Sequence, residues 1–454
     1  MIRFIDRDKE LELLNEEWNS PGAKFIVLYG RRRIGKTSLL NEFCKGKKGI
    51  FHISADEYNH VQISEIRQKF SSFFNDDFLR NTDLPDWENL FLYLTRIIPP
   101  EKRFYVVLDE FTYLVKNDRS ILSKLQRFWD TFLSRTNIFL VICGSDLGMM
   151  ENEVLSYSSP TYGRRSRDIL LPPMELKSAM KFTNMNFDDR LRLFMTVGGI
   201  PEYLTRAEKY GDYNKFIQAE FWNSQGYFYR EPYYLLSQEF KDYNTYFSIL
   251  NAISYGKNKP SEIANFLGVE GRKIYPYLEN LIRLRFISRI TPVFSSKNSG
   301  HYEISDRMVE FWFNYVYTNR EFIERGTVNE NFNFQGYFGR VFERIIRDSV
   351  FPSIYKDCTI GTWWYKDTEI EVIGISPDKK RIIFGECKWR DNVNPAPIVE
   401  DLRRKVKVFL RDMEFESVSY NIIAKSFSRK IEDDNISLLD LSDLEGMLAN
   451  HGKS

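Results

Sequence analysis

Apolar and polar positions follow two rhythms in the first 170 residues of the chain. Short, almost purely apolar runs are separated by longer amphipathic stretches, which is typical of strands and helices in a layered α/β domain. We expect strands at 24–29, 49–54, 104–108, 138–143 and 168–171, and the clearest helix at 119–134. Runs such as YVVL and IFLVIC have no polar face. They therefore predict a parallel sheet that helices cover on both sides.

The pattern of apolar and polar positions changes after residue 172. Between 173 and 239 the strand-like runs stop and the sequence reads as helical, broken by the Gly198-Gly199-Ile200-Pro201 turn. From 241 to 320, three helical stretches precede two extended runs, 286–292 and 301–304, which flank a polar loop. Three helices followed by a hairpin are the order of a winged helix.

A third pattern begins near residue 334. The expected elements are an amphipathic helix at 336–350, strands at 362–365, 370–375 and 381–388, a helix at 398–411 and a strand at 417–424. This order predicts a second, smaller α/β domain. The chain is thus expected to comprise a core at 1–172, a helical lid at 173–240, a winged helix at 241–320, the second α/β domain at 334–430 and a C-terminal tail at 431–454.

Length, composition and net charge exclude several classes of protein. A chain of 454 residues, 43% hydrophobic and 28% charged, is too long for one core and too apolar for a disordered class. The formal net charge of +1 gives no global basic excess, so a nucleic-acid partner would have to meet a local patch. Residues 241–290 carry such a patch, with eight Lys and Arg against four acids.

Cysteine usage and the N-terminal sequence indicate a cytoplasmic protein. The four cysteines, Cys44, Cys143, Cys358 and Cys387, are too scattered for a disulfide framework, and none forms a CxxC pair. The chain opens on charged residues, and its longest apolar run, 138–143, is too short to span a membrane.

A phosphate-binding loop follows the first expected strand. Residues 30–37 read GRRRIGKT, which matches G-x-x-x-x-G-K-[ST] in the correct strand-to-helix context. Lys36 would reach the β/γ oxygens, and the Thr37 hydroxyl would bind Mg²⁺. The nucleotide-binding residues are expected to be Gly30, Arg31, Arg32, Arg33, Ile34, Gly35, Lys36, Thr37 and Ser38. The three arginines suit nucleotide charge or acids of the lid better than a DNA contact.

Two acids follow another apolar strand. Asp109 and Glu110 lie at the carboxyl end of 104–108, where ligands bind in open parallel sheets. We expect Asp109 to hold Mg²⁺, directly or through water, and Glu110 to polarise the attacking water. Ser145, after the strand at 138–143, would bond the water or the γ-phosphate, or simply cap its strand.

Several motifs together resemble a known family. FIDRDKEL, YGRRRIGKT, VVLDEF, ICGSDLGMM, YGRRS and GGIPEYL are similar, in order and spacing, to an archaeal and bacterial P-loop ATPase family related to the STAND ATPases and the wider AAA+ class. The resemblance covers about residues 1–320. It implies a five-stranded core with the Ser145 strand between the phosphate-loop and Asp109 strands. It also implies that Arg7 lies near the base and that the Gly199-Ile200-Pro201 turn approaches the nucleotide.

Two arginines in the YGRRS motif have alternative interpretations. Arg164 or Arg165 resembles the arginine that meets the γ-phosphate in such ATPases, from the same chain or from a neighbour. From the residues alone, a pair of arginines in a Gly-containing loop is equally consistent with a solvated turn.

The second α/β domain carries charged residues at strand spacing. Glu386 and Lys388 share one strand face, as do Glu369 and Glu371 on the preceding strand. With Glu343 on the opening helix, this is the layout of the PD-(D/E)XK, restriction-endonuclease-like fold, in which carboxylates bind Mg²⁺ and lysine orients water or stabilises the phosphate. Charges two residues apart are also common on a solvent-facing strand.

The second α/β domain also resembles a domain family of unassigned function, and it departs from the nuclease motif at one position. Residues 335–430, with FGECKW as the best match, are similar to a domain of unassigned function that often follows this ATPase. Glu371 stands where the nuclease pattern has Asp, and the extra methylene would shift the metal and weaken or abolish cutting. The fold is expected, and DNA hydrolysis is left open.

The expected function is that of an ATP- and Mg²⁺-dependent ATPase switch, coupled to a DNA-binding or nuclease-like C-terminal module. The alternative is a regulatory or scaffold ATPase whose winged helix and inactive nuclease-like domain bind protein partners or a second copy of the chain. Expected catalytic residues are Lys36, Glu110, Arg165, Glu371, Glu386 and Lys388; expected metal ligands are Thr37, Asp109, Glu343, Glu371 and Glu386; Ser145 and Pro201 are expected beside the nucleotide.

Overall fold

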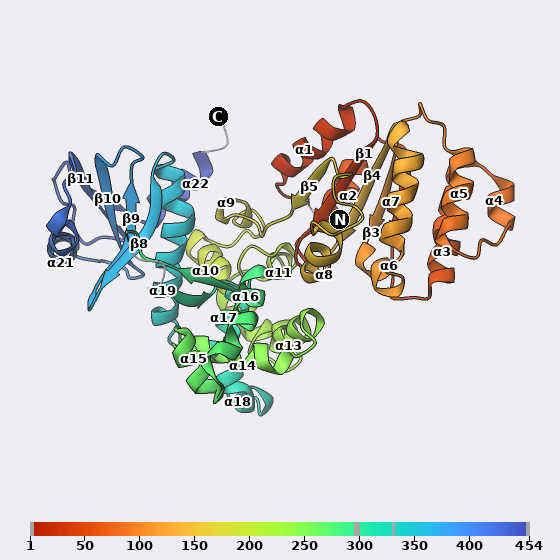
Figure 1. The fold of residues 1–454 in the computed structure, drawn as a ribbon. Helices are drawn as coiled ribbons and strands as arrows, with labels where there is room; N and C mark the ends of the chain where they lie inside the picture. The colour runs from red at the N-terminus through yellow and green to blue at the C-terminus, as the bar shows by residue number, and fades with distance from the viewer. Residues whose placement is uncertain (1–3, 295–299, 329–331, 451–454) are drawn as a thin grey trace. The chain divides into compact units, whose positions relative to one another are not determined.

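The computed structural model describes residues 4–294, 300–328 and 332–450 (Figure 1). The chain forms two compact units. Unit 1 comprises Met1–Pro173 with Ile200–Glu202, and unit 2 comprises Met174–Gly199 with Tyr203–Ser454. Most of the polar loop expected between the two hairpin strands, residues 295–299, lies outside the described residues.

Unit 1 is built on a five-stranded parallel sheet of order β2-β3-β4-β1-β5. Its strands are β1 (Lys24–Tyr29), β2 (Gly49–Ile53), β3 (Phe104–Asp109), β4 (Ile138–Gly144) and β5 (Arg167–Leu170). Each expected strand is confirmed, with ends that differ by a single residue at most. β4 lies between β1 and β3, as the family resemblance implied. Every residue of β3 and β4 is buried, which explains why these runs have no polar face.

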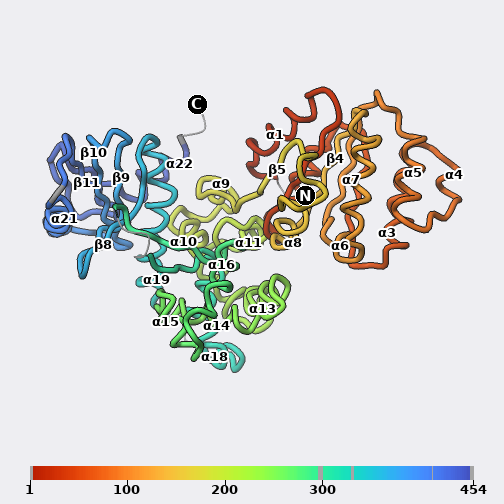
Figure 2. The backbone as a smooth tube through the Cα atoms, in the orientation of Figure 1, coloured from red at the N-terminus to blue at the C-terminus, as the bar shows by residue number. Residues whose placement is uncertain are grey.

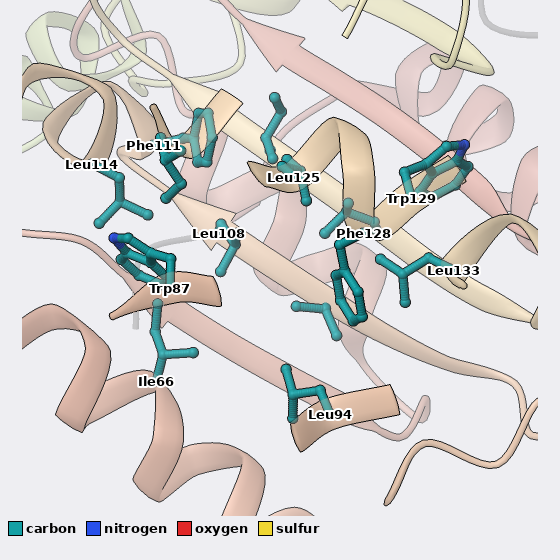
Figure 3. Close-up of a cluster of buried hydrophobic side chains, with 14 of the residues drawn as sticks. Ile66, Trp87, Leu94, Leu108, Phe111, Leu114, Leu125, Phe128, Trp129 and Leu133 are labelled. Atoms are coloured by element: carbon teal, nitrogen blue, oxygen red, sulfur yellow. The ribbon is translucent and has the colours of Figure 1, made fainter. Parts of the chain in front are cut away.

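Helices cover both faces of this sheet. They are α1 (Asp8–Asn19), α2 (Lys36–Cys44), α3 (Asn59–Phe74), α4 (Asp77–Asn81), α5 (Trp87–Ile97), α6 (Phe111–Asn117), α7 (Ile121–Thr131) and α8 (Leu147–Met149). On one face, Trp18 of α1 packs edge-on against Phe43 of α2 and Phe139 of β4. On the other, α3, α5, α6 and α7 bury the cluster drawn in Figure 3, which includes Trp87 and Phe111.

Unit 2 begins with helices and a hairpin. The helices are α9 (Leu176–Ala179), α10 (Phe187–Val197), α11 (Pro201–Ala207, whose first two residues belong to unit 1), α12 (Tyr213–Glu220), α13 (Tyr227–Glu239), α14 (Tyr243–Ser254), α15 (Pro260–Leu267) and α16 (Tyr275–Arg283). β6 (Ile287–Ile290) and β7 (His301–Ile304) then pair antiparallel. The expected order of three helices and two extended runs is therefore present.

A mixed sheet forms the C-terminal part of unit 2. After α17 (Arg307–Phe311) and α18 (Arg320–Glu324), the elements are α19 (Gln335–Ile345), α20 (Phe351–Ile354), β8 (Thr359–Tyr365), β9 (Thr368–Ile375), β10 (Arg381–Lys388), α21 (Pro395–Phe409), β11 (Ser417–Ala424), β12 (Ile436–Leu439) and α22 (Leu441–Asn450). The strand order is β12-β11-β10-β9-β8, antiparallel from β8 to β10 and parallel from β10 to β12. Figure 2 traces β8 to β11 side by side with α21.

Two C-terminal elements differ from the sequence expectation. β12 and α22 lie in 431–454, which was expected to be a tail, and β12 pairs with β11 as part of the sheet. β12 is only four residues long and includes Ser437, so its periodicity carried no signal. In the described part of the chain, no helix combines the length and apolar character needed to cross a membrane.

Candidate functional site

The loop between β1 and α2 has the backbone of a phosphate cradle. Gly35, the residue before α2, has a φ of 90°, and Arg33 has a φ of 68°, so the backbone turns sharply at this loop. Gly30 is required by a close approach, because a Cβ there would lie 2.7 Å from the Leu171 carbonyl oxygen. Ile34 is fully buried and anchors the loop, whereas Ser38 is exposed on α2.

Lys36 lies across this loop. Its Nζ donates to the carbonyl oxygens of Gly30 and Arg31, both at 2.9 Å, and only 5% of the residue is exposed. Burial lowers the pKa of Lys36, an effect that Cys143, Glu110 and Asp109 oppose. A buried ammonium group held only by carbonyl oxygens is well placed to exchange them for phosphate oxygens.

Thr37 and Asp109 form a pair at the start of α2. The Thr37 hydroxyl donates to Asp109 Oδ2 at 2.5 Å, and Asp109 Oδ1 accepts the Glu110 N–H at 2.9 Å. Asp109 is fully buried. A hydroxyl and a carboxylate side by side are the hard oxygen ligands that Mg²⁺ takes, so the donor set fits this ion.

Glu110 and Ser145 meet at the carboxyl ends of β3 and β4. The Ser145 hydroxyl donates to Glu110 Oε2 at 2.6 Å, and Glu110 has a left-handed φ of 51° where α6 begins. Sequence reasoning gave Ser145 a role toward water, phosphate or its own strand, and it missed this contact. The sequence did carry a signal for this contact, because Glu110 and Ser145 each follow a strand and adjacent parallel strands bring such residues to one edge of the sheet.

Two further expected residues border the cradle within unit 1. Arg7 Nη2 donates to the Pro172 carbonyl at 2.7 Å and to the Ile34 carbonyl at 3.4 Å. Pro201 Cγ lies 3.9 Å from the position that a Cβ on Gly35 would take. Within unit 1, the structure therefore brings Arg7 and Pro201 to the loop, as the resemblance implied.

Arg164 and Arg165 lie at the other end of the sheet. Ser166 N–H bonds the Phe25 carbonyl at the start of β1, whereas the phosphate loop follows its end. At about 3.3 Å per residue, β1 separates these arginines from the loop by roughly 15 Å. Arg165 instead donates to the Val154 carbonyl at 3.0 Å and pairs with Asp168, while Arg164 pairs with Asp130.

The expected C-terminal acids come together in unit 2. Lys388 Nζ lies 2.8 Å from Glu386 Oε1 and 3.3 Å from Glu371 Oε1. Glu371 Oε2 accepts the Cys387 N–H at 2.6 Å. Lys405 of α21, which sequence reasoning missed, donates to both oxygens of Glu386 at 3.0 Å. A lysine on an amphipathic helix reads as part of a solvated face, so the sequence carried no signal for it.

The electrostatics confirm that these carboxylates crowd one another. Burial, and after it the neighbouring charges of Glu386 and Glu343, raise the pKa of Glu371 to about 8. Burial also raises the pKa of Glu343 to about 7, against the opposing effect of Lys388. Burial lowers the pKa of Lys388, but Glu371 and Glu386 outweigh it, so the net shift is upward. The acid cluster is thus desolvated and compensated by ammonium groups.

A cavity of about 550 Å³ adjoins this cluster. Glu343, Glu369 and Glu371 line it together with residues of β7. Within residues 4–294, 300–328 and 332–450, no group of three or more His, Cys, Asp or Glu side chains is arranged to hold a metal ion. In their present contacts the carboxylates of Glu371 and Glu386 bond the Cys387 N–H and the ammonium groups of Lys388 and Lys405.

Comparison with known families agrees with the geometry of unit 1. A family described as an ATPase domain predominantly from Archaea matches residues 4–207. A second family, described as archaeal and bacterial proteins of unknown function, matches residues 312–406. This second match overlaps the segment at 335–430 that resembled a domain of unassigned function.

Individual proteins extend the comparison. Uncharacterized protein MJECL04 of Methanocaldococcus jannaschii is 32% identical over 455 residues, covering 97% of this chain and 99% of that protein. Uncharacterized ATP-binding protein MJ0423 of the same organism is 48% identical over 48 residues, 11% of this chain and 81% of that protein. Among solved structures, the Walker-type ATPase PABY2304 of Pyrococcus abyssi has a TM-score of 0.51 and 22% identity over 68% of this chain and 96% of that one, which shows a shared fold.

This chain and MJECL04 are 32% identical over nearly their whole lengths, which shows that they belong to one family. The match at 4–207 identifies the first domain of this chain. The phosphate loop, the buried Lys36 and the Thr37–Asp109 pair lie within this matched segment. The chain therefore belongs to the same protein family as MJECL04, and its N-terminal part is an ATP-binding P-loop ATPase domain of the archaeal type.

Proposed function

We propose that unit 1 hydrolyses ATP in a magnesium-dependent reaction and that the nucleotide state acts as a switch. The observation that carries this proposal is the Glu110 carboxylate, which Ser145 holds at the carboxyl edge of the sheet beside Asp109. Nucleotide binding alone does not require a second, positioned acid, whereas activation of water does.

Each group then has a separate role. The N–H groups of the loop and of the α2 N-terminus bind phosphate oxygens, and Lys36 exchanges its carbonyl contacts for the β/γ oxygens. Thr37 and Asp109 would hold Mg²⁺, which neutralises charge on the phosphates when it is bound. Glu110 orients the attacking water and accepts its proton, while Ser145 keeps the Glu110 carboxylate in place.

The test is phosphate release by the full chain with ATP and Mg²⁺. Glu110→Gln should bind ATP normally and lose turnover by about a hundredfold or more, because the amide cannot take the proton. Glu57→Gln, which changes an exposed acid beyond β2, is the matched control and should hydrolyse ATP at the wild-type rate. Normal turnover by Glu110→Gln would remove Glu110 from the mechanism.

For the arginines, we propose action between copies of the chain. The position of Arg165 at the far end of β1 supports a role on the nucleotide of a neighbouring copy rather than its own. Arg165→Ala and Lys36→Ala should each be inactive alone, and a mixture should regain activity because the two lesions fall on different sites. No recovery on mixing would contradict a shared site.

The output of the switch is proposed to be nucleic-acid binding by the helix-and-hairpin segment, which we interpret as a winged helix. Arg272 and Lys273 are exposed at the turn before α16, as a phosphate contact requires. Binding of duplex DNA should weaken steeply with salt, and Arg272→Glu with Lys273→Glu should weaken it further. If DNA does not bind at low salt, a protein partner becomes the better candidate.

A further inference from the structure

Every carboxylate oxygen of Glu371 and Glu386 already accepts a hydrogen bond from this chain. Glu386 Oε1 accepts from Lys388 and Lys405, and its Oε2 accepts from Lys405. Glu371 Oε1 accepts from Lys388, and its Oε2 accepts from the Cys387 N–H. Because Glu386 is only 4% exposed, water does not compete strongly for these positions.

The length of Glu371 has a structural reason. The β9–β10 backbone register ends at Val372 opposite Gly385, so the amide of Cys387 lies beyond the paired residues. The Glu371 carboxylate bonds this amide at 2.6 Å. An Asp at position 371 would be one methylene shorter and would not reach it in the same way. The departure from the nuclease pattern therefore coincides with a contact to the backbone.

We infer that Lys388 and Lys405 are the resident cations of this cluster, and that Lys405 keeps a divalent ion from Glu386. The C-terminal domain on this account carries a compensated acid cluster rather than the metal site of a nuclease. The inference refines the C-terminal part of the proposed function and does not depend on ATP hydrolysis, which is measured separately.

Charge and geometry on α21 support the role of Lys405. Lys405 Nζ lies 3.0 Å from each carboxylate oxygen of Glu386, so one ammonium group spans the whole carboxylate edge. Asp401, one turn earlier, lies 3.4 Å from the same Nζ. Asp401 and Glu386 thus hold Lys405 from two sides. Loss of the ammonium group would leave Glu386 with Lys388 as its remaining partner.

The experiment is a Mn²⁺ titration of the nucleotide-free full chain, followed by electron paramagnetic resonance. The variants are Lys405→Gln, Lys405→Met and the control Lys407→Gln, which removes an exposed charge from the same helix. Each is also combined with Glu386→Gln to identify ions bound at this cluster. Circular dichroism establishes that each variant is folded.

Both Lys405 variants should bind Mn²⁺ at the cluster on the order of tenfold or more tightly than wild type, because removal of a unit charge a few ångströms away lowers the repulsion. Lys407→Gln should match the wild type, and Glu386→Gln should abolish the gain. Wild-type binding as tight as that of the Lys405 variants, and lost in Glu386→Gln, would overturn the inference. Folded Lys405 variants without a gain would overturn it equally.

Discussion

Two acid pairs belong to the sheets of this chain, Asp109 and Glu110 at the carboxyl end of β3 and Glu371 and Glu386 within β9 and β10, and their hydrogen-bond partners differ. Asp109 and Glu110 of unit 1 accept hydrogen bonds from the neutral hydroxyls of Thr37 and Ser145. Glu386 of unit 2, by contrast, accepts from two ammonium groups. A hydroxyl leaves a carboxylate with its charge uncompensated and can itself share a metal ion, whereas an ammonium group neutralises that charge.

Acid spacing along strands is therefore not enough to assign chemistry. At the first pair, Lys36 is directed to carbonyl oxygens of the loop and leaves the acids available. At the second pair, the lysines are directed to the acids themselves. The partner atoms, rather than the residue types, separate a site for a cation from a compensated cluster.

The largest effect is expected for Lys36→Ala. Removal of the buried ammonium group should weaken ATP binding and reduce turnover by at least about a hundredfold, because a charged donor to the phosphates is lost. Phosphate release and binding of a fluorescent ATP analogue measure the two effects. Lys405→Gln is the contrasting variant and should leave ATP turnover unchanged. Equal losses of ATP turnover in both variants would contradict the claim that Lys36 acts on the nucleotide and Lys405 does not.

A smaller effect is expected for Ser145→Ala. Loss of the 2.6 Å contact should let Glu110 drift and reduce kcat by roughly tenfold, with KM for ATP unchanged. Steady-state kinetics give the split between kcat and KM, and thermal unfolding tests whether the fold is intact. A rise in KM with constant kcat would instead assign Ser145 to nucleotide binding.

The smallest effect concerns stability and pH in unit 2. The pKa of Glu371 is about 8 in the folded chain against an ordinary value of 4.5, so folding binds its proton more tightly. Its contribution to stability is therefore fully present below about pH 4.5 and is lost as pH rises to about 8. Glu371→Gln should show a smaller fall in Tm between pH 5 and pH 8 than wild type does.

Calorimetry at several pH values checks this prediction. Glu369→Gln is the matched control, since Glu369 lies on the same strand and is exposed. Its Tm profile should follow that of wild type. If Glu371→Gln and Glu369→Gln lost stability with pH in the same way, the desolvated state of Glu371 would be contradicted.

Much of unit 1 could be predicted because its signals are local. Runs such as IFLVIC are apolar throughout, and the loop at 30–37 couples a strand end to a helix start within eight residues. Asp109 comes directly after the apolar run at 104–108, so the parallel order of the sheet was enough to place it at the carboxyl edge.

The missed features depend on contacts between distant segments. The Ser145–Glu110 bond joins residues on neighbouring strands, and the Lys405–Glu386 bond joins a helix to a strand 19 positions earlier. The bond from Cys387 N–H to Glu371 depends on where the β9–β10 pairing ends. Hydrophobic periodicity reports which face a residue occupies, but it does not report the partner it meets there.

The most direct test of this account is a count of Mn²⁺ ions bound to the full chain in the presence of a non-hydrolysable ATP analogue. The account predicts a single tightly bound ion, lost in Asp109→Ala and unaffected by Glu386→Gln. A second tight ion that disappears in Glu386→Gln would show that both acid pairs hold a cation, and it would contradict the distinction drawn between them.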